Sequence, residues 1–145
     1  MTQPLVQPGP ARRLGRSIAA LVAGFVVAVV LSLATDLGLH AAGLAPAPSQ
    51  RWSTNLLLIA TVYRTLYGIL SSYIVARLAP YRPMLHSFIG GAIGLLLSIA
   101  GAIATWNAGL GPHWYPVALI VGALPSAWIG GKLRLMQLKD PEVKQ

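Results

Sequence analysis

The chain has 145 residues, of which 55% are hydrophobic and only 10% are charged, and it contains no cysteine. Soluble domains carry about 25% charged residues, so we expect a membrane protein with one compact helical bundle, embedded in a lipid bilayer. The lack of cysteine excludes disulfides, thiol catalysis and cysteine-ligated metals. The net charge of +8 arises in tails and loops, where membrane topology accounts for it, so we expect no nucleic-acid partner.

Residues 1–16 contain three prolines and three arginines and predict a disordered basic N-terminal tail. The apolar run that follows predicts a membrane helix over about 17–39. A cleaved signal peptide is the alternative, but the run exceeds the roughly 7–15 apolar residues usual there. Small residues recur along one face of this helix at a spacing that lets two backbones approach closely: Ala20, Gly24, Ala28 and Ser32.

The second predicted helix covers about 55–79 and carries Arg64 near its middle. At 1.5 Å per residue, Arg64 lies roughly 13 Å in from Asn55, close to the midplane of the hydrocarbon. A charge there costs at least ~2.5–3.5 kcal/mol, so some group must offset it. A helical projection places Tyr63 on the opposite, apolar side. The polar stripe around Arg64 consists of Thr61, Thr65, Ser71 and Ser72, with Tyr67 at its border.

Two further apolar segments predict helices over about 84–106 and 113–131, followed by a basic cytoplasmic tail over 132–145. Pro125 lies inside the last helix and is expected to kink it. Each of these helices also carries a face of small residues, expected to pack within the bundle, with a homo-oligomer or a membrane-protein partner as the alternative. These residues are Gly90, Gly91, Gly94, Ser98 and Gly101 on the third helix and Gly122, Ser126 and Gly130 on the fourth.

The distribution of basic residues predicts the topology. Apart from Arg64 inside the second helix, every lysine and arginine except Arg51 lies on the side that holds both termini. Basic loops remain in the cytoplasm, so we expect four spans in the bacterial inner membrane with both termini cytoplasmic. The predicted fold is therefore all-α, a four-transmembrane-helix bundle with antiparallel neighbours.

The turn between the second and third helices carries a recognisable motif. Ala76-Arg77-Leu78-Ala79-Pro80, then Pro83-Met84 and His86, precedes the glycine-rich Ile89-Gly90-Gly91-Ala92-Ile93-Gly94. These residues resemble small bacterial four-helix integral membrane proteins to which no activity is attached. The resemblance covers the later two-thirds of the chain and implies no catalytic or binding residues.

Arg64 is the main candidate for a functional residue. An ionisable side chain inside the membrane indicates by default an ion, lipid or proton site. The structural alternative is a charge neutralised by Asp36, the sole acidic residue outside the C-terminal tail, with help from Tyr67. Both interpretations stay open at this point.

A second candidate is a metal site. Asp36 and His40 are four residues apart and share a helix face, and His113 begins the fourth helix on the same side. Two histidines and a carboxylate are competent zinc ligands, although closed sites normally supply four. A third, weaker candidate is contact of His86, Arg82 and Arg77 with anionic lipid, although a loop that only sets the membrane topology is sufficient to explain these residues.

The sequence contains no nucleotide-binding loop, catalytic triad, carboxylate pair or H-E-x-x-H motif, so an enzyme is poorly supported and no cofactor is predicted. The leading hypothesis is a small structural or accessory subunit of the inner membrane. The alternative is a small transporter or channel with a polar path past Arg64. A metal-dependent membrane enzyme is the weakest of the three.

Overall fold

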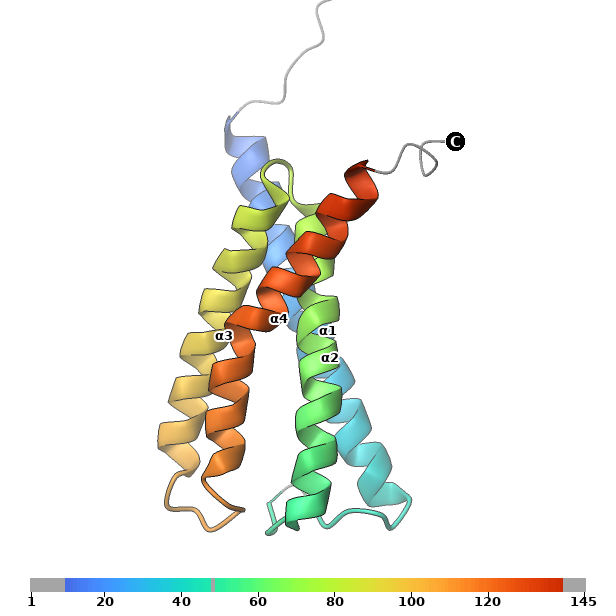
Figure 1. Ribbon diagram of the computed structural model, residues 1–145, viewed down its shortest axis with the longest axis vertical. Helices are drawn as coiled ribbons and strands as arrows, with labels where there is room; N and C mark the ends of the chain where they lie inside the picture. Colours follow the sequence, from blue (N-terminus) through green and yellow to red (C-terminus); the bar gives the residue numbers. More distant parts are fainter. Residues whose placement is uncertain (1–9, 48, 140–145) are drawn as a thin grey trace, which may run out of the picture.

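The computed structural model describes residues 10–47 and 49–139, which form four α-helices and no strand (Figure 1). All four helices are long and apolar enough to cross a membrane, and this confirms the predicted helical bundle of a multi-pass membrane protein. The helices are α1 (Pro10–Ala41), α2 (Thr54–Leu78), α3 (Pro83–Thr105) and α4 (Trp114–Lys139).

Two helices extend beyond their predicted bounds. α1 begins at Pro10, so residues 10–16 are helical rather than part of a disordered tail, and residues 1–9 lie outside the described chain. Proline suits a first helical turn, and alanine, arginine and leucine then favour the helix. α4 continues through 132–139, predicted as tail, because its Lys, Leu, Arg, Met and Gln residues are all good helix formers. The remaining tail, 140–145, lies outside the described residues.

The helices form two pairs that are joined mainly through α2 and α4. α4 packs against α2 and α3, whereas α1 packs against α2, contacts α3 only slightly and, within the described residues, does not reach α4. Figure 1 shows the α1/α2 pair and the α3/α4 pair separated at the end that holds residues 42–53 and 106–113, the loop end. They cross toward the opposite end, which holds the start of α1 and the end of α4 and is called the terminal end below. α4, which contains Pro125, bends midway along its length (Figure 1).

Small residues close the terminal half of the bundle. A Cβ added to Gly130 would lie 2.5 Å from the Ile69 carbonyl oxygen, so α4 touches the backbone of α2 there. A Cβ added to Gly91 would meet Ala127, and the fully buried Ser87 hydroxyl donates to the Ala127 carbonyl at 2.6 Å. Close backbone approach of this kind requires residues without bulky side chains. The terminal end is therefore tightly packed.

Other small residues make few contacts with neighbouring helices. Gly94 and Gly101 on α3 would each place an added Cβ in open space, and one on Gly122 would find only the Thr65 hydroxyl, at 4.0 Å. The faces predicted for helix packing are thus used unevenly, tight toward the terminal end and open along the loop half. This difference creates the cavities described below.

The loop end has a small core of its own. Trp52 is buried at 7% exposure with Ala45, Leu57 and Ala60. Its indole N–H donates to the Ala47 carbonyl, and its backbone N–H donates to the Leu110 carbonyl of the other loop at 3.0 Å. This last hydrogen bond links the two loops across the separated helix pairs.

We expect Gly130→Ala to lower the free energy of unfolding by about 1–3 kcal/mol, the usual cost of overpacking, because backbone atoms of α2 cannot move aside. The matched control is Gly122→Ala on the same helix, which has room for its methyl group and should be neutral or slightly stabilising. Thermal unfolding in detergent measures both. Equal midpoints for the two variants would contradict a tightly packed terminal end.

Candidate functional site

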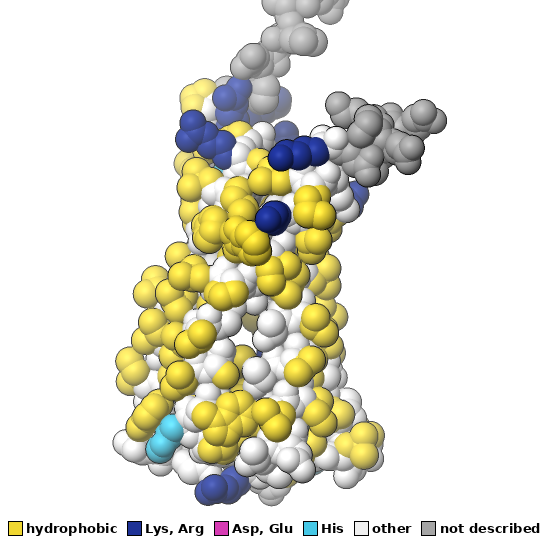
Figure 2. All heavy atoms as spheres, in the orientation of Figure 1, with side chains coloured by type: hydrophobic (Ala, Val, Ile, Leu, Met, Phe, Trp, Pro, Cys, Tyr) yellow, Lys and Arg dark blue, Asp and Glu magenta, His cyan; other side chains and the backbone are white. Residues whose placement is uncertain are grey.

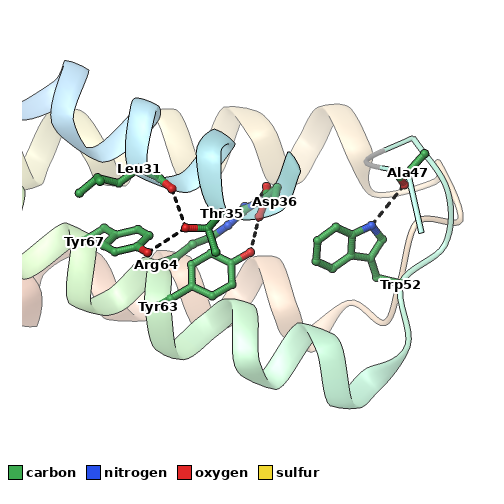
Figure 3. Close-up of polar contacts among 8 residues, drawn as sticks. All are labelled: Leu31, Thr35, Asp36, Ala47, Trp52, Tyr63, Arg64 and Tyr67. Carbon is green, nitrogen blue, oxygen red and sulfur yellow. Dashed lines mark hydrogen bonds and ion pairs between the residues drawn. The ribbon is translucent and has the colours of Figure 1, made fainter. Parts of the chain in front are cut away.

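An ion pair joins α1 to α2 in the loop half of the bundle. Nη2 of Arg64 donates to Oδ2 of Asp36 at 2.5 Å, and Asp36 is only 5% exposed (Figure 3). Arg64 is at the eleventh position of α2 and Asp36 is near the loop end of α1, so the arginine extends toward the loop end to reach its partner. The pair offsets a charge that would otherwise be costly inside a membrane.

Tyr63 completes the carboxylate site, and its predicted place on the apolar side is wrong. Its hydroxyl donates to Oδ1 of Asp36, so each carboxylate oxygen accepts a hydrogen bond (Figure 3). The helical projection describes α2 alone, whereas α1 packs along the side that carries Tyr63. The sequence does contain an indication of this contact. Tyr63 lies one turn before Tyr67, so the two side chains share a helix face, and that face meets α1.

Tyr67 contacts Thr35 rather than the guanidinium group. Its hydroxyl and the Thr35 hydroxyl are 2.8 Å apart, and Thr35 also donates to the Leu31 carbonyl of its own helix (Figure 3). The contact between α1 and α2 therefore consists of two adjacent polar groups, the carboxylate with its two donors and the Thr35–Tyr67 pair.

The remaining hydroxyl-bearing residues of the predicted polar stripe have different partners. Thr61 and Thr65 each donate to a carbonyl four residues earlier in α2. Ser71 donates to the Gly24 carbonyl of α1 at 2.7 Å. Ser72 is buried, and a Cβ added to Gly130 of α4 would lie 2.7 Å from the Cβ of Ser72. The stripe thus divides into two residues bonded to their own helix and two that join neighbouring helices.

Arg64 keeps unused hydrogen-bonding capacity. A guanidinium has five N–H donors, and the structure pairs Arg64 by one hydrogen bond, that to Asp36. Its Nε is buried and has no hydrogen-bond partner within residues 10–47 and 49–139, and its Cζ lies 5.8 Å from the centroid of the Tyr115 ring on α4. The sequence alone did not indicate Tyr115 as part of the site, because only the packing of α4 against α2 brings its ring close to Arg64. A hydrogen-bond acceptor in the adjacent space would satisfy the free donors.

Two cavities meet at Arg64. The first, of about 330 Å³, runs from loop residues such as Gln50 and Gly111 to Asp36 and Arg64, past the rings of Trp52, Trp106 and Tyr115. The second, of about 260 Å³, extends from Arg64 toward the terminal half, between α1, α2, α3 and α4. Arg64, Ser98 and Leu119 line both cavities. The space-filling view is hollowed between the two helix pairs at mid-height (Figure 2).

Several residues predicted to pack helices also line the second cavity. The contacts of Gly130 and Ser87 close the space beyond it, toward the terminal end. The open space thus runs from the loop end past Arg64 into the terminal half, and helix contacts close it only near the terminal end. The predicted packing residues that line the second cavity are Ala28, Ser32, Gly90, Gly91, Gly94, Ser98, Gly122 and Ser126, whereas Gly101 lines the first.

The three candidate metal ligands are not brought together. Nδ1 of His40 lies 3.2 Å from the Ala45 carbonyl, and Nε2 of His113 lies 2.9 Å from the Trp106 carbonyl. His113 also stacks on the Trp106 ring, while Asp36 is engaged by Arg64. No group of three His, Cys, Asp or Glu side chains among the described residues is arranged to hold a metal ion. The hydrogen-bonded loop and the ring stacking hold the two histidines apart.

His86, a weaker candidate for contact with anionic lipid, does not lie at a lipid-facing surface. It is buried at 3% exposure, with Nε2 2.8 Å from the Ser17 hydroxyl of α1 and Nδ1 3.3 Å from the Arg82 carbonyl. It therefore fastens the start of α3 to α1, and the candidate lipid contact loses this residue.

Comparison with known proteins gives no assignment: no family model matches the chain, and neither a curated protein nor a solved structure is significantly similar to it.

Arg64→Leu should reduce the free energy of unfolding by roughly 3 kcal/mol, because it leaves the Asp36 carboxylate buried without its charge partner. The double variant Asp36→Leu/Arg64→Leu should recover most of that loss, since it removes both charges. Thermal unfolding in detergent measures both effects.

Arg51→Leu is the matched control for this pair, because it removes an arginine that is exposed at the loop end. It should leave the stability unchanged. A double variant as unstable as Arg64→Leu alone would show that the ion pair does not account for the loss.

Proposed function

We propose that this protein is a small inner-membrane transporter or channel-type protein that binds a polar solute at Arg64, with both termini in the cytoplasm. The observation that carries the proposal is that two cavities meet at Arg64, one of them lined by residues of the loop end. A charge within the membrane that lines a cavity, rather than a closed core, is typical of a substrate or ion pathway.

The chemistry of the site supports a solute with hydrogen-bond acceptors. Arg64 offers N–H donors beyond the one that Asp36 uses, and no described residue accepts a hydrogen bond from its buried Nε. A guanidinium matches planar carboxylates and phosphates particularly well. Asp36 neutralises the site at rest, so the solute would have to share Arg64 with it or displace it. Aromatic rings beside the charge provide an apolar wall, as is usual in ligand pockets.

The arrangement of the two ends supports access from the loop end. Packing of Gly130 and Ser87 closes the terminal end, whereas the first cavity reaches the residues of the loop end. Basic residues concentrate at the terminal end, where Figure 2 shows most of the Lys and Arg side chains of this face. By the positive-inside rule the closed end is cytoplasmic, and the hollow therefore opens outward.

A structural or accessory subunit is the second candidate, and the completeness of the ion pair favours it. Arg64 and Asp36 neutralise one another without any ligand, and they fasten α1 to α2. Under this alternative the hollow would be filled by lipid or by a partner helix and would hold no water. Accessibility of the hollow to water therefore separates the two candidates.

The absence of cysteine allows a direct test by single-cysteine labelling. Ser98→Cys changes only an oxygen to a sulfur in a residue that lines both cavities. Because the reactive species is the thiolate, which requires water, a membrane-impermeant maleimide should label Ser98→Cys in intact cells. Arg51→Cys should also be labelled, which would place the loop end outside, and Lys139→Cys should be labelled only after lysis.

Two matched positions control for depth and for burial. Leu97→Cys lies at the same depth on the exposed, apolar outer surface of α3, and Ser87→Cys is fully buried at the terminal end. Neither should react. If Ser98→Cys stays unlabelled while Arg51→Cys is labelled, the hollow is not an aqueous pathway and the transporter proposal fails in favour of the accessory subunit.

A further inference from the structure

A second cationic site lies at the terminal end of α2 and α4, separate from the Arg64 site. Nη1 of Arg77 donates to the Tyr73 hydroxyl at 3.2 Å, and that hydroxyl donates to Oε1 of Gln137 at 2.7 Å. Nη1 of Arg134 lies 3.4 Å from the same Gln137 oxygen. Two guanidinium groups from different helices thus converge on one tyrosine–glutamine contact.

This cluster has no counter-ion among the described residues. Asp36 is the one carboxylate in that part of the chain, and it is paired with Arg64, which precedes Arg77 by about 20 Å of helix. Nε of Arg134 is buried and has no hydrogen-bond partner in the part of the chain that the structure describes. Two like charges held together raise the free energy of the folded chain, and an anion between them would lower it.

An apolar groove adjoins the cluster. It has a volume of about 600 Å³, lies between α2 and α4, and shares Tyr73 and Gln137 with the cationic cluster. Leu66, Leu70, Leu133 and Met136 are exposed, so the groove is part of the outer surface of the bundle. The residues that line the groove are Leu66, Ile69, Leu70, Tyr73, Leu133, Met136 and Gln137.

We propose that this surface binds an anionic phospholipid of the surrounding bilayer, with its phosphodiester between Arg77 and Arg134 and an acyl chain along the groove. The cations match the headgroup charge, the forked guanidinium groups match its paired oxygens, and the groove continues in the direction of the hydrocarbon. The site does not depend on the function proposed for Arg64.

Native mass spectrometry of the full-length protein in detergent tests this proposal with phosphatidylglycerol, phosphatidylcholine and free glycerol phosphate as probes. Phosphatidylglycerol should bind more tightly than phosphatidylcholine. Arg77→Gln/Arg134→Gln should weaken binding of phosphatidylglycerol about thirtyfold, the combined effect of two interfacial cations. Arg77→Lys/Arg134→Lys keeps the charge and should retain the preference for the anionic lipid.

The matched control is Arg12→Gln/Arg16→Gln, which removes the same charge from the terminal end of α1, a helix that does not contact α4 in the described part of the chain. This variant should bind phosphatidylglycerol like the parent. An equal loss in both double-glutamine variants would overturn the site in favour of a general attraction to the basic end. Glycerol phosphate binding as tightly as the lipid would overturn the role of the groove.

Discussion

The Arg64–Asp36 ion pair is the interaction on which the rest of the bundle depends. A charge on a membrane-spanning helix requires a partner, and Asp36 supplies it from α1. α1 contacts α3 only slightly and does not reach α4 within the described residues, so its place is set mainly by α2. The ion pair, the Tyr63 and Tyr67 contacts and the Ser71–Gly24 hydrogen bond therefore hold α1 against α2, and the hydrogen bond between His86 and Ser17 adds one contact with α3.

Packing of small residues explains why the bundle is sealed at one end and hollow at the other. Gly130 faces the backbone of α2 and Gly91 faces the Cβ of Ala127, so neither position has room for a side chain. Where Gly94 and Gly101 face nothing within 4 Å, the same residue type leaves a void. Because apolar residues gain nothing by leaving lipid, helix association in a membrane depends on such close contacts, and the helix pairs separate where the contacts end.

Arginine plays two different roles at two depths in this protein. Arg64, within the span, is paired with a carboxylate and still has free donors that face a cavity. Arg77 and Arg134, at the end of the same helix and on α4, have polar neighbours but no carboxylate among the described residues. The difference follows from solvation, since a charge at the membrane surface is stabilised by water and lipid headgroups, whereas one inside must find its counter-ion within the protein.

The sequence by itself determined the class of fold, the number of helices and the position of one charge inside a span, because length, hydropathy and the 3.6-residue period are local properties. It also identified Asp36 as the available partner for Arg64. Only the tertiary structure decided which side chains surround that pair: Tyr63 and Tyr115 belong to the site, while His40 and His113 bond to separate loop carbonyls. The reason is that helical periodicity defines a face only relative to its own axis. Which neighbour that face meets, and whether glycines there close a contact or leave a cavity, depends on how the helices rotate and cross.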